Sequence, residues 1–140
     1  MSNSSTVPVE LSTPTTRWSI AGLLLEALAA RDFALMSDCF ETAATMRALL
    51  PRGLAECEGA TQIVESLRTW FGAAEEFEVL DGTVGEVGDR LHVAWRLRLR
   101  PTPWGDEAWN VIEQQAYLRA GERIDAIDLL CSGFQPENHS

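Results

Sequence analysis

Lysine is missing from the sequence altogether, and the residues that most often bind metals are scarce. The 11 basic residues are all arginines, and with 21 aspartates and glutamates they give a formal charge of −10. Such a surface repels phosphate backbones and anionic lipids, so we expect no nucleic-acid or membrane partner. The two histidines and three cysteines lie far apart and form no CxxC pair, which disfavours a structural zinc site.

Long apolar runs are also absent. No segment approaches the roughly 18 apolar residues that a membrane span needs, and the N-terminus lacks the basic and apolar regions of a secretory signal. With unpaired cysteines, these absences predict a cytoplasmic protein with reduced thiols. The Ser-, Thr- and Pro-rich residues 1–16 are expected to form a flexible arm, residues 17–135 a single domain, and residues 136–140 a short tail.

The first half of the domain follows helical spacing. After Thr16, a suitable N-cap, apolar residues recur three and four positions apart; they are Ile20, Leu23, Leu24, Ala27 and Leu28. Asp32 can cap a short second helix, and Thr61 can cap a third helix that ends near Gly72.

The second half alternates with a period of two, as strands do. The clearest case is residues 91–99, where Leu, Val and Trp alternate with His, Ala and Arg. Further strands are expected over residues 42–50, 77–87, 109–119 and 124–134, joined mainly by hairpins. Helices followed by hairpins predict an α+β fold, with a cone-shaped, curved antiparallel sheet packed against three N-terminal helices.

Because side chains alternate between the two faces of a strand, either its odd-numbered or its even-numbered residues face the core; we call this choice the parity of the strand. Residues 91–99 must turn their apolar, odd-numbered positions inward, and a hairpin symmetrical about Trp104 carries this parity to the following strands. The inward-facing residues predicted on those strands are Trp109, Val111, Glu113, Gln115, Tyr117, Ile127, Leu129 and Cys131. Trp95, Glu113 and Leu129 would then form one row across the sheet. A one-residue bulge would reverse the assignment.

Five segments carry a resemblance to a known family. They are residues 24–33 (LLEALAARDF), Glu58-Gly59 before a helix that ends in Trp70-Phe71, residues 89–95 (DRLHVAW), residues 113–117 (EQQAY) and residues 121–124 (GERI). In their order and spacing, residues 18–134 resemble the nuclear transport factor 2-like superfamily, in particular its SnoaL-like branch. The resemblance implies the cone-shaped fold with a mostly apolar pocket between helices and sheet.

The family includes ketosteroid isomerases, polyketide cyclases and epoxide hydrolases, along with non-catalytic binding modules, so the fold alone does not decide the function. The proton-transfer groups of those enzymes are missing at the matching positions. Ala48 stands where ketosteroid isomerases carry the base, Leu24 where they carry a tyrosine, and Leu129 where cyclases and epoxide hydrolases carry an aspartate. Gln115 stands where those enzymes have Asp or His. Steroid isomerisation and standard epoxide hydrolysis are therefore disfavoured.

Glu113 is the candidate acid or base among the residues that remain. A carboxylate beside Trp95 and Leu129 would be desolvated and so suited to proton transfer. Two alternatives stay open: Glu113 pairs with an arginine such as Arg47 or Arg98, or it faces solvent.

Gln115 and Tyr117 are candidate hydrogen-bond anchors for a carbonyl or enolate oxygen, although each could instead be structural. The rest of the predicted substrate-binding lining is Trp70, Trp95, Ala48, Ile127, Leu129 and Cys131.

These residues favour a small-molecule enzyme that acts on a hydrophobic organic substrate in an apolar pocket. A polyketide-type cyclase or an isomerase fits best, with no metal or organic cofactor. The alternative is a non-catalytic ligand-binding or dimerisation module of the same fold. We expect a homodimer that pairs through the outer face of the sheet, which carries Arg96, Arg98 and Arg100.

Overall fold

The computed structural model describes residues 13–137 of the chain, with side chains from Ser19 onward. The helices are α1 (Thr13–Ala30), α2 (Phe33–Asp38) and α3 (Ala60–Phe71). The strands are β1 (Phe40–Leu50), β2 (Gly53–Glu58), β3 (Glu76–Val87), β4 (Arg90–Arg100), β5 (Asn110–Ala120), β6 (Ile124–Cys131) and β7 (Gln135–Pro136).

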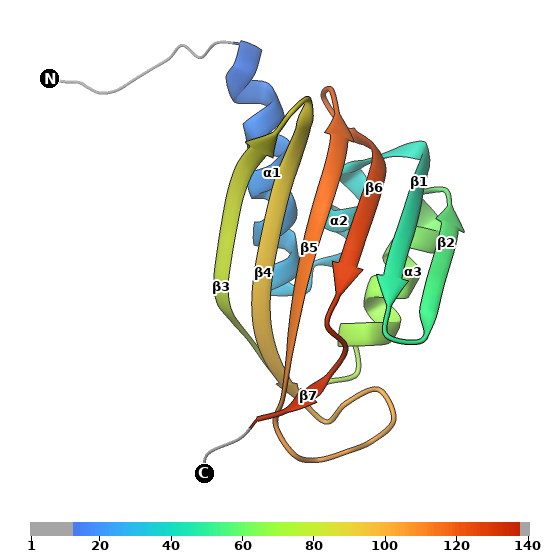
Figure 1. The fold of residues 1–140 in the computed structure, drawn as a ribbon, viewed down its shortest axis with the longest axis vertical. Helices are drawn as coiled ribbons and strands as arrows, with labels where there is room; N and C mark the ends of the chain where they lie inside the picture. Colours follow the sequence, from blue (N-terminus) through green and yellow to red (C-terminus); the bar gives the residue numbers. More distant parts are fainter. Residues whose placement is uncertain (1–12, 138–140) are drawn as a thin grey trace, which may run out of the picture.

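One curved sheet forms the front layer of the molecule, and the three helices cover its other face (Figure 1). The strand order is β2-β1-β6-β5-β4-β3, and the short β7 pairs with β5. Neighbouring strands are antiparallel except β1 and β6, which run parallel. The predicted α+β cone with three helices is confirmed, with a mixed sheet. None of the helices in this part of the chain has the length and hydropathy that crossing a bilayer requires.

Some element boundaries differ from the sequence prediction. Helix α1 begins at Thr13, so residues 13–16 are helical; the remainder of the predicted arm, residues 1–12, lies outside the described residues. Of the predicted tail, residues 138–140 also lie outside them. Strand β2 was not predicted, because only every second residue of its short sequence is partly buried. Gly59, with φ of 91°, takes the N-cap position that Thr61 was expected to occupy in α3.

The register of the β4–β5 hairpin differs from the predicted one. Trp95 lies opposite Gln114 instead of Glu113, and Leu99 lies opposite Asn110. The even-numbered residues of β5 therefore face the core, and Glu113 and Gln115 are exposed. The predicted inward orientation of Val111, Glu113, Gln115 and Tyr117 is wrong. Tyr117 lies on the outer face, where it lines a cavity with the exposed Leu49, Leu54 and Leu130.

The physical reason lies in the connecting loop. Thr102 and Asp106 do pair about Trp104, since Thr102 N donates to Asp106 O at 2.9 Å and Asp106 N donates to Thr102 Oγ1 at 3.0 Å. The Asp106 carboxylate then accepts from Ala108 N at 3.0 Å, an Asx turn on one side of the loop only. This turn accommodates one extra residue before β5, and one extra residue reverses the parity of the whole strand.

A second irregularity restores the predicted parity in β6. Arg119 lies opposite Ala126, but Ala120 lies opposite Ile124, so the register shifts beside the turn. Ile127 and Leu129 consequently face inward, as predicted, although their cross-strand partners are Leu118 and Ala116.

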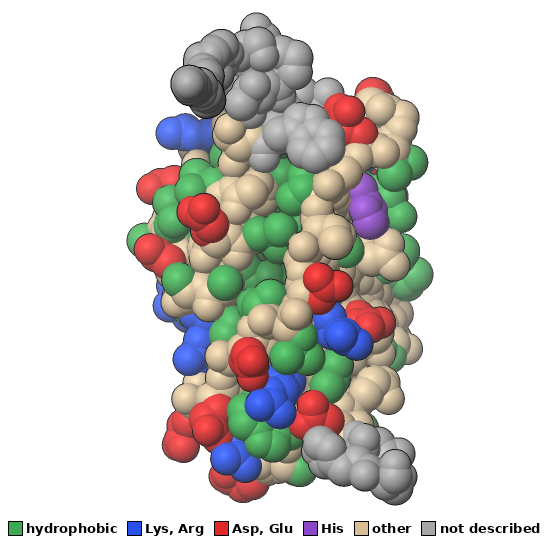
Figure 2. All heavy atoms as spheres, turned by 90° about the vertical axis from the view of Figure 1, so that its left-hand side faces the viewer, with side chains coloured by type: hydrophobic (Ala, Val, Ile, Leu, Met, Phe, Trp, Pro, Cys, Tyr) green, Lys and Arg blue, Asp and Glu red, His purple; other side chains and the backbone are tan. Residues whose placement is uncertain are grey.

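The outer face and the β3 edge carry paired charges. Arg98 Nε donates to Glu78 Oε1 at 3.0 Å, and Arg100 pairs with Glu76. Figure 2 shows acidic and basic side chains mixed over this side of the molecule. Charged side chains along an exposed edge strand discourage pairing with the edge of another chain.

Cys39 joins α2 to β1 and is fully buried. Its carbonyl accepts from Ile124 N at 2.8 Å, which places the start of β1 beside β6. Burial, with a smaller contribution from Asp38, raises the pKa of the Cys39 thiol from 9.0 to about 11.

This raised pKa predicts a loss of stability at high pH. Between pH 9 and about 11 the unfolded chain releases a proton that the folded chain keeps, so the free energy of unfolding falls as the pH rises. The expected slope is at most ~1.4 kcal/mol per pH unit. Urea unfolding of the wild type and of Cys39→Ala at several pH values checks it. The Cys39→Ala profile should be flatter, whereas the control Cys57→Ala should follow the wild type; parallel profiles for all three proteins would contradict the assignment.

Candidate functional site

The space between the helices and the sheet is almost completely filled. Its remaining cavity measures about 10 Å³, about the smallest space that can hold one water molecule. The cavity is lined only by apolar side chains and Trp95; they are Leu24, Leu28, Met36, Phe40, Met46, Ile63, Leu67, Trp95, Ile127 and Leu129. The cone therefore encloses a packed core, in place of the open apolar pocket that the sequence predicted.

Gln114 is the polar side chain that the corrected register brings to the core. It is 1% exposed, and its Oε1 accepts from Trp95 Nε1 at 2.8 Å. Its Nε2 lies 3.3 Å from Cys131 Sγ, to which it donates. The amide thus satisfies the buried indole and links β4, β5 and β6 in one row. Sequence reasoning singled out the adjacent Gln115 and missed Gln114 because of the parity error.

The three predicted polar site residues on β5 do not meet between the helices and the sheet. Glu113 and Gln115 instead line an open cavity of about 400 Å³ on the outer face of the sheet. Glu113 is exposed, and its backbone N–H donates to Ser132 Oγ at 2.9 Å. Gln115 Oε1 lies 2.9 Å from His92 Nε2, and the ring of Tyr117 lies 5.0 Å from that of His92. Glu113 and Gln115 therefore lie on the outer face of the sheet, away from the predicted pocket.

The family positions that lack proton-transfer groups do lie at the core. Ala48 and Leu129 are directly opposite each other on β1 and β6, and both are buried. Leu24 of α1 is 4% exposed and lines the small internal cavity with Leu129. Apolar side chains therefore meet where the resemblance would place a base, a tyrosine and an aspartate.

A much larger cavity, of about 480 Å³, lies at the end of the sheet where the β1–β2 turn, the C-terminus of α3 and the β4–β5 loop meet. We call it the end pocket. Its lining residues are Leu50, Pro51, Arg52, Thr69, Trp70, Pro103, Trp104, Ile112, Cys131, Gly133 and Phe134. Trp70 and Cys131, both predicted to bind substrate, lie here, whereas Trp95, Ile127 and Leu129 line the internal cavity.

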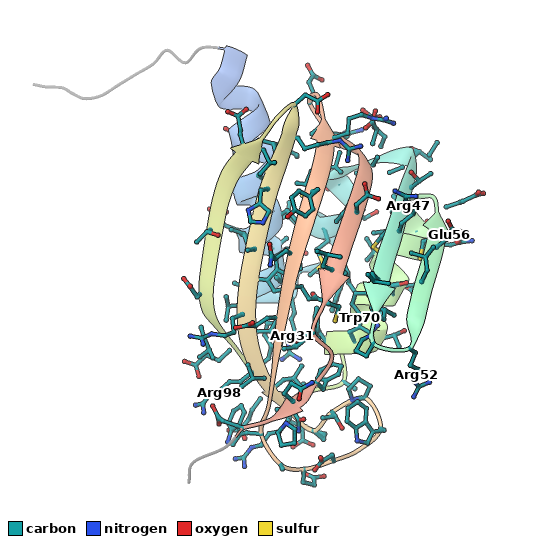
Figure 3. The ribbon with its side chains drawn as sticks, viewed as in Figure 1. Arg31, Arg47, Arg52, Glu56, Trp70 and Arg98 are labelled. Carbon is teal, nitrogen blue, oxygen red and sulfur yellow. The ribbon has the colours of Figure 1, made fainter. Side chains whose placement is uncertain are left out.

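Local structure holds the walls of the end pocket in place. Trp104 packs edge-on against Phe134 with 5.3 Å between ring centroids, yet remains 64% exposed. Trp104 lies in the β4–β5 loop, which is closed by the hydrogen bond from the backbone N–H of the buried Thr102 to the carbonyl of Asp106. In Figure 3 Trp70 lies on α3 behind the sheet, and Arg52 extends from the tip of the β1–β2 hairpin. Pro103 and Trp104 were predicted in the β4–β5 loop and Phe134 in a strand, with no role at a site. An aromatic residue beside a proline in a long loop was the signal that could have found Trp104.

Acid/base groups are scarce in the described interior. The buried polar side chains of residues 19–137 are those of Thr102, Asn110 and Gln114. Across the same residues no three histidine, cysteine or carboxylate side chains gather as metal ligands do. The geometry provides an apolar surface for binding, with one arginine, Arg52, among the residues that line it.

Comparison with solved structures identifies the fold. A nuclear transport factor 2-like protein of unknown function from Burkholderia xenovorans superposes with a TM-score of 0.59 at 13% identity, covering 91% of this chain and 89% of that chain. A proposed polyketide cyclase from Xanthomonas campestris pv. campestris gives a TM-score of 0.65 at 15% identity, with coverages of 85% and 92%. The chain has the nuclear transport factor 2-like fold.

A proposed isomerase of the SnoaL-like family from Agrobacterium tumefaciens shares this fold, with a TM-score of 0.54 and 20% identity over 85% of this chain and 99% of that chain. No protein-family model matches the sequence, and no curated protein shows significant sequence similarity to it. The resemblance seen in the sequence is confirmed at the level of the nuclear transport factor 2-like fold, while identities this low leave the chemistry to be argued from the chain's own residues.

The two adjacent glutamines provide a matched test of the register. Gln114→Leu should lower the free energy of unfolding by ~1–3 kcal/mol, because the buried Trp95 Nε1 loses its acceptor. Gln115→Leu changes an exposed side chain and should alter stability by at most ~0.5 kcal/mol. Urea unfolding followed by tryptophan fluorescence measures both. A larger loss for Gln115→Leu than for Gln114→Leu would mean that the opposite face of β5 is buried.

Proposed function

We propose that the protein binds a hydrophobic small organic molecule in the end pocket. The observation that carries this proposal is the mostly apolar lining of the end pocket at a volume of about 480 Å³, whereas the space inside the cone is about 10 Å³. The outer-face cavity beside Glu113 and Gln115, of about 400 Å³, is lined mainly by polar and charged side chains. Ligand pockets are typically ~300–1,000 Å³ and mostly apolar. Two tryptophans, one phenylalanine and several aliphatic residues line the end pocket, so an apolar ligand would lose water from a large surface there.

A cofactor-independent cyclase or isomerase is the second candidate. It is supported by the proposed polyketide cyclase and SnoaL-like isomerase that share the fold. Glu113 lies on the outer face and is not among the residues that line the end pocket, so it is not placed to act there as an acid or base. A reaction at the end pocket would instead depend on holding a flexible substrate in a reactive conformation.

Binding is tested with the neutral fluorescent dye phenylnaphthylamine. The wild type should bind the dye with an increase in its fluorescence, and Trp104→Ala should weaken binding about three- to tenfold, because the dye loses one aromatic wall. Trp104 is 64% exposed, so its removal should leave the fold intact, which circular dichroism can confirm. Val87→Ala, another exposed apolar position, is the control. Absence of dye binding by the wild type, or equal binding by Trp104→Ala, would refute the proposed pocket.

We propose that the protein forms a homodimer through the outer face of the sheet. Leu54, Leu49 and Leu130 lie side by side on β2, β1 and β6 and are 61%, 51% and 44% exposed. Beside them Arg47 Nε donates to Asp128 Oδ1 at 3.0 Å. A row of exposed leucines next to paired charges has the apolar centre and polar rim of an interface.

A charge introduced into the leucine row should prevent this association. Leu130→Asp should convert the dimer into a monomer, because two copies of the carboxylate would be buried without partners. Val87→Asp places the same charge at an exposed position at the end of β3 and should leave the dimer intact. Sedimentation or light scattering at micromolar concentration measures the mass. A monomeric wild type, or a dimer unaffected by Leu130→Asp, would count against the interface.

A further inference from the structure

The polar groups around the end pocket differ in how far they are already satisfied. Five lining side chains carry polar or polarisable atoms: the neutral indoles of Trp70 and Trp104, and Arg52, Thr69 and Cys131. Thr69 Oγ1 donates to the carbonyl of Glu65 at 2.9 Å. Cys131 Sγ accepts from Gln114 Nε2 and from Gly133 N, each at 3.3 Å. These two groups are therefore engaged within the protein.

Arg52 differs from both. Its guanidinium makes no hydrogen bond or ion pair with any other residue that the structure describes, whereas Arg47, Arg68 and Arg98 are each paired with a carboxylate. It extends from the β1–β2 turn (Figure 3), and it is one of the residues that line the pocket. The flexible stem of an arginine lets the guanidinium approach a ligand at the rim while its charge stays hydrated.

We propose that the ligand of the end pocket is an amphipathic organic acid, with an aromatic or alicyclic body and one carboxylate that pairs with Arg52. The inference rests on the proposed binding function and adds the class of the ligand. Trp70, Trp104 and Phe134 take the apolar body, because they provide the aromatic walls. The carboxylate lies at the rim, where a planar guanidinium can bind both of its oxygens.

The overall negative charge of the protein opposes the approach of an anionic ligand. The formal charge is −10, so the long-range field repels an anion. Arg52 is the one cation among the pocket-lining residues, so it is the group there that can attract an anionic ligand by charge at short range. Salt screens the long-range repulsion more strongly than a direct ion pair.

Two dyes with the same skeleton test the inference. Anilinonaphthalene sulfonate carries one anionic group, and phenylnaphthylamine carries none. Arg52→Gln should weaken binding of the sulfonate about three- to tenfold while leaving the neutral dye unchanged, since only the sulfonate loses a charge-assisted contact. The matched control is Arg123→Gln, an exposed arginine in the β5–β6 turn at the opposite end of the sheet, which makes the same change in net charge. Fluorescence titration at two salt concentrations gives the dissociation constants.

The outcomes separate this inference from the proposed function. If the wild type binds neither dye, binding at the end pocket itself is refuted. If both dyes bind but Arg52→Gln affects them equally, or affects neither, the pocket stands and the organic-acid class is overturned. An equal loss of sulfonate binding in Arg123→Gln would also overturn it, because net charge would then account for the effect. A loss confined to Arg52→Gln and to the sulfonate supports the pairing.

Discussion

The hydrogen bond between Trp95 and Gln114 is the contact on which the interior arrangement depends. It joins two buried polar groups across β4 and β5, and each would cost free energy if left without a partner. Shifting β5 by one residue would place Glu113 or Gln115 against the helices and expose a row of apolar side chains. The register, the filled core and the outward position of Glu113 therefore follow from one another. Because Gln114 also contacts Cys131, the same amide connects the core to the wall of the end pocket.

Because the interior of the cone is filled by side chains, a ligand can bind only outside the core, as in the end pocket. Apolar residues from all three helices and three strands occupy the space between helices and sheet, so close packing stabilises this region and leaves no room for a substrate. The end pocket is built differently, from a turn, a helix C-terminus, a loop and the last residues of β6. Segments of this kind tolerate substitution more readily than a core does. Proteins with this fold can thus differ in ligand while sharing the packed layers.

Much of the fold was predictable from the sequence, and the polar site was not. Periodicity located three helices and the long strands, because burial of one face imposes a spacing that apolar residues reveal directly. The inward positions of Ala48, Ile127 and Leu129 were also correct. Parity across a hairpin, by contrast, depends on the number of residues in the loop, and the Asx turn at Asp106 adds one. The bulge beside Ala120 reversed the parity again, so β6 was correct although β5 was not.

This difference between β5 and β6 shows how far each kind of sequence inference extends. The register of an apolar strand is set by its own side chains. Exposing Ile127 and Leu129 to water would cost free energy whatever the length of the preceding turn. Strand β5 carries glutamate, two glutamines and tyrosine between its apolar residues, so its pattern alone allows either face to be buried. Trp95 on the neighbouring strand β4 determines which face of β5 is buried. Its indole needs an acceptor, and Gln114 supplies one in the observed register only. A polar residue in such a strand can be assigned to a site only after the partner of each buried donor has been identified.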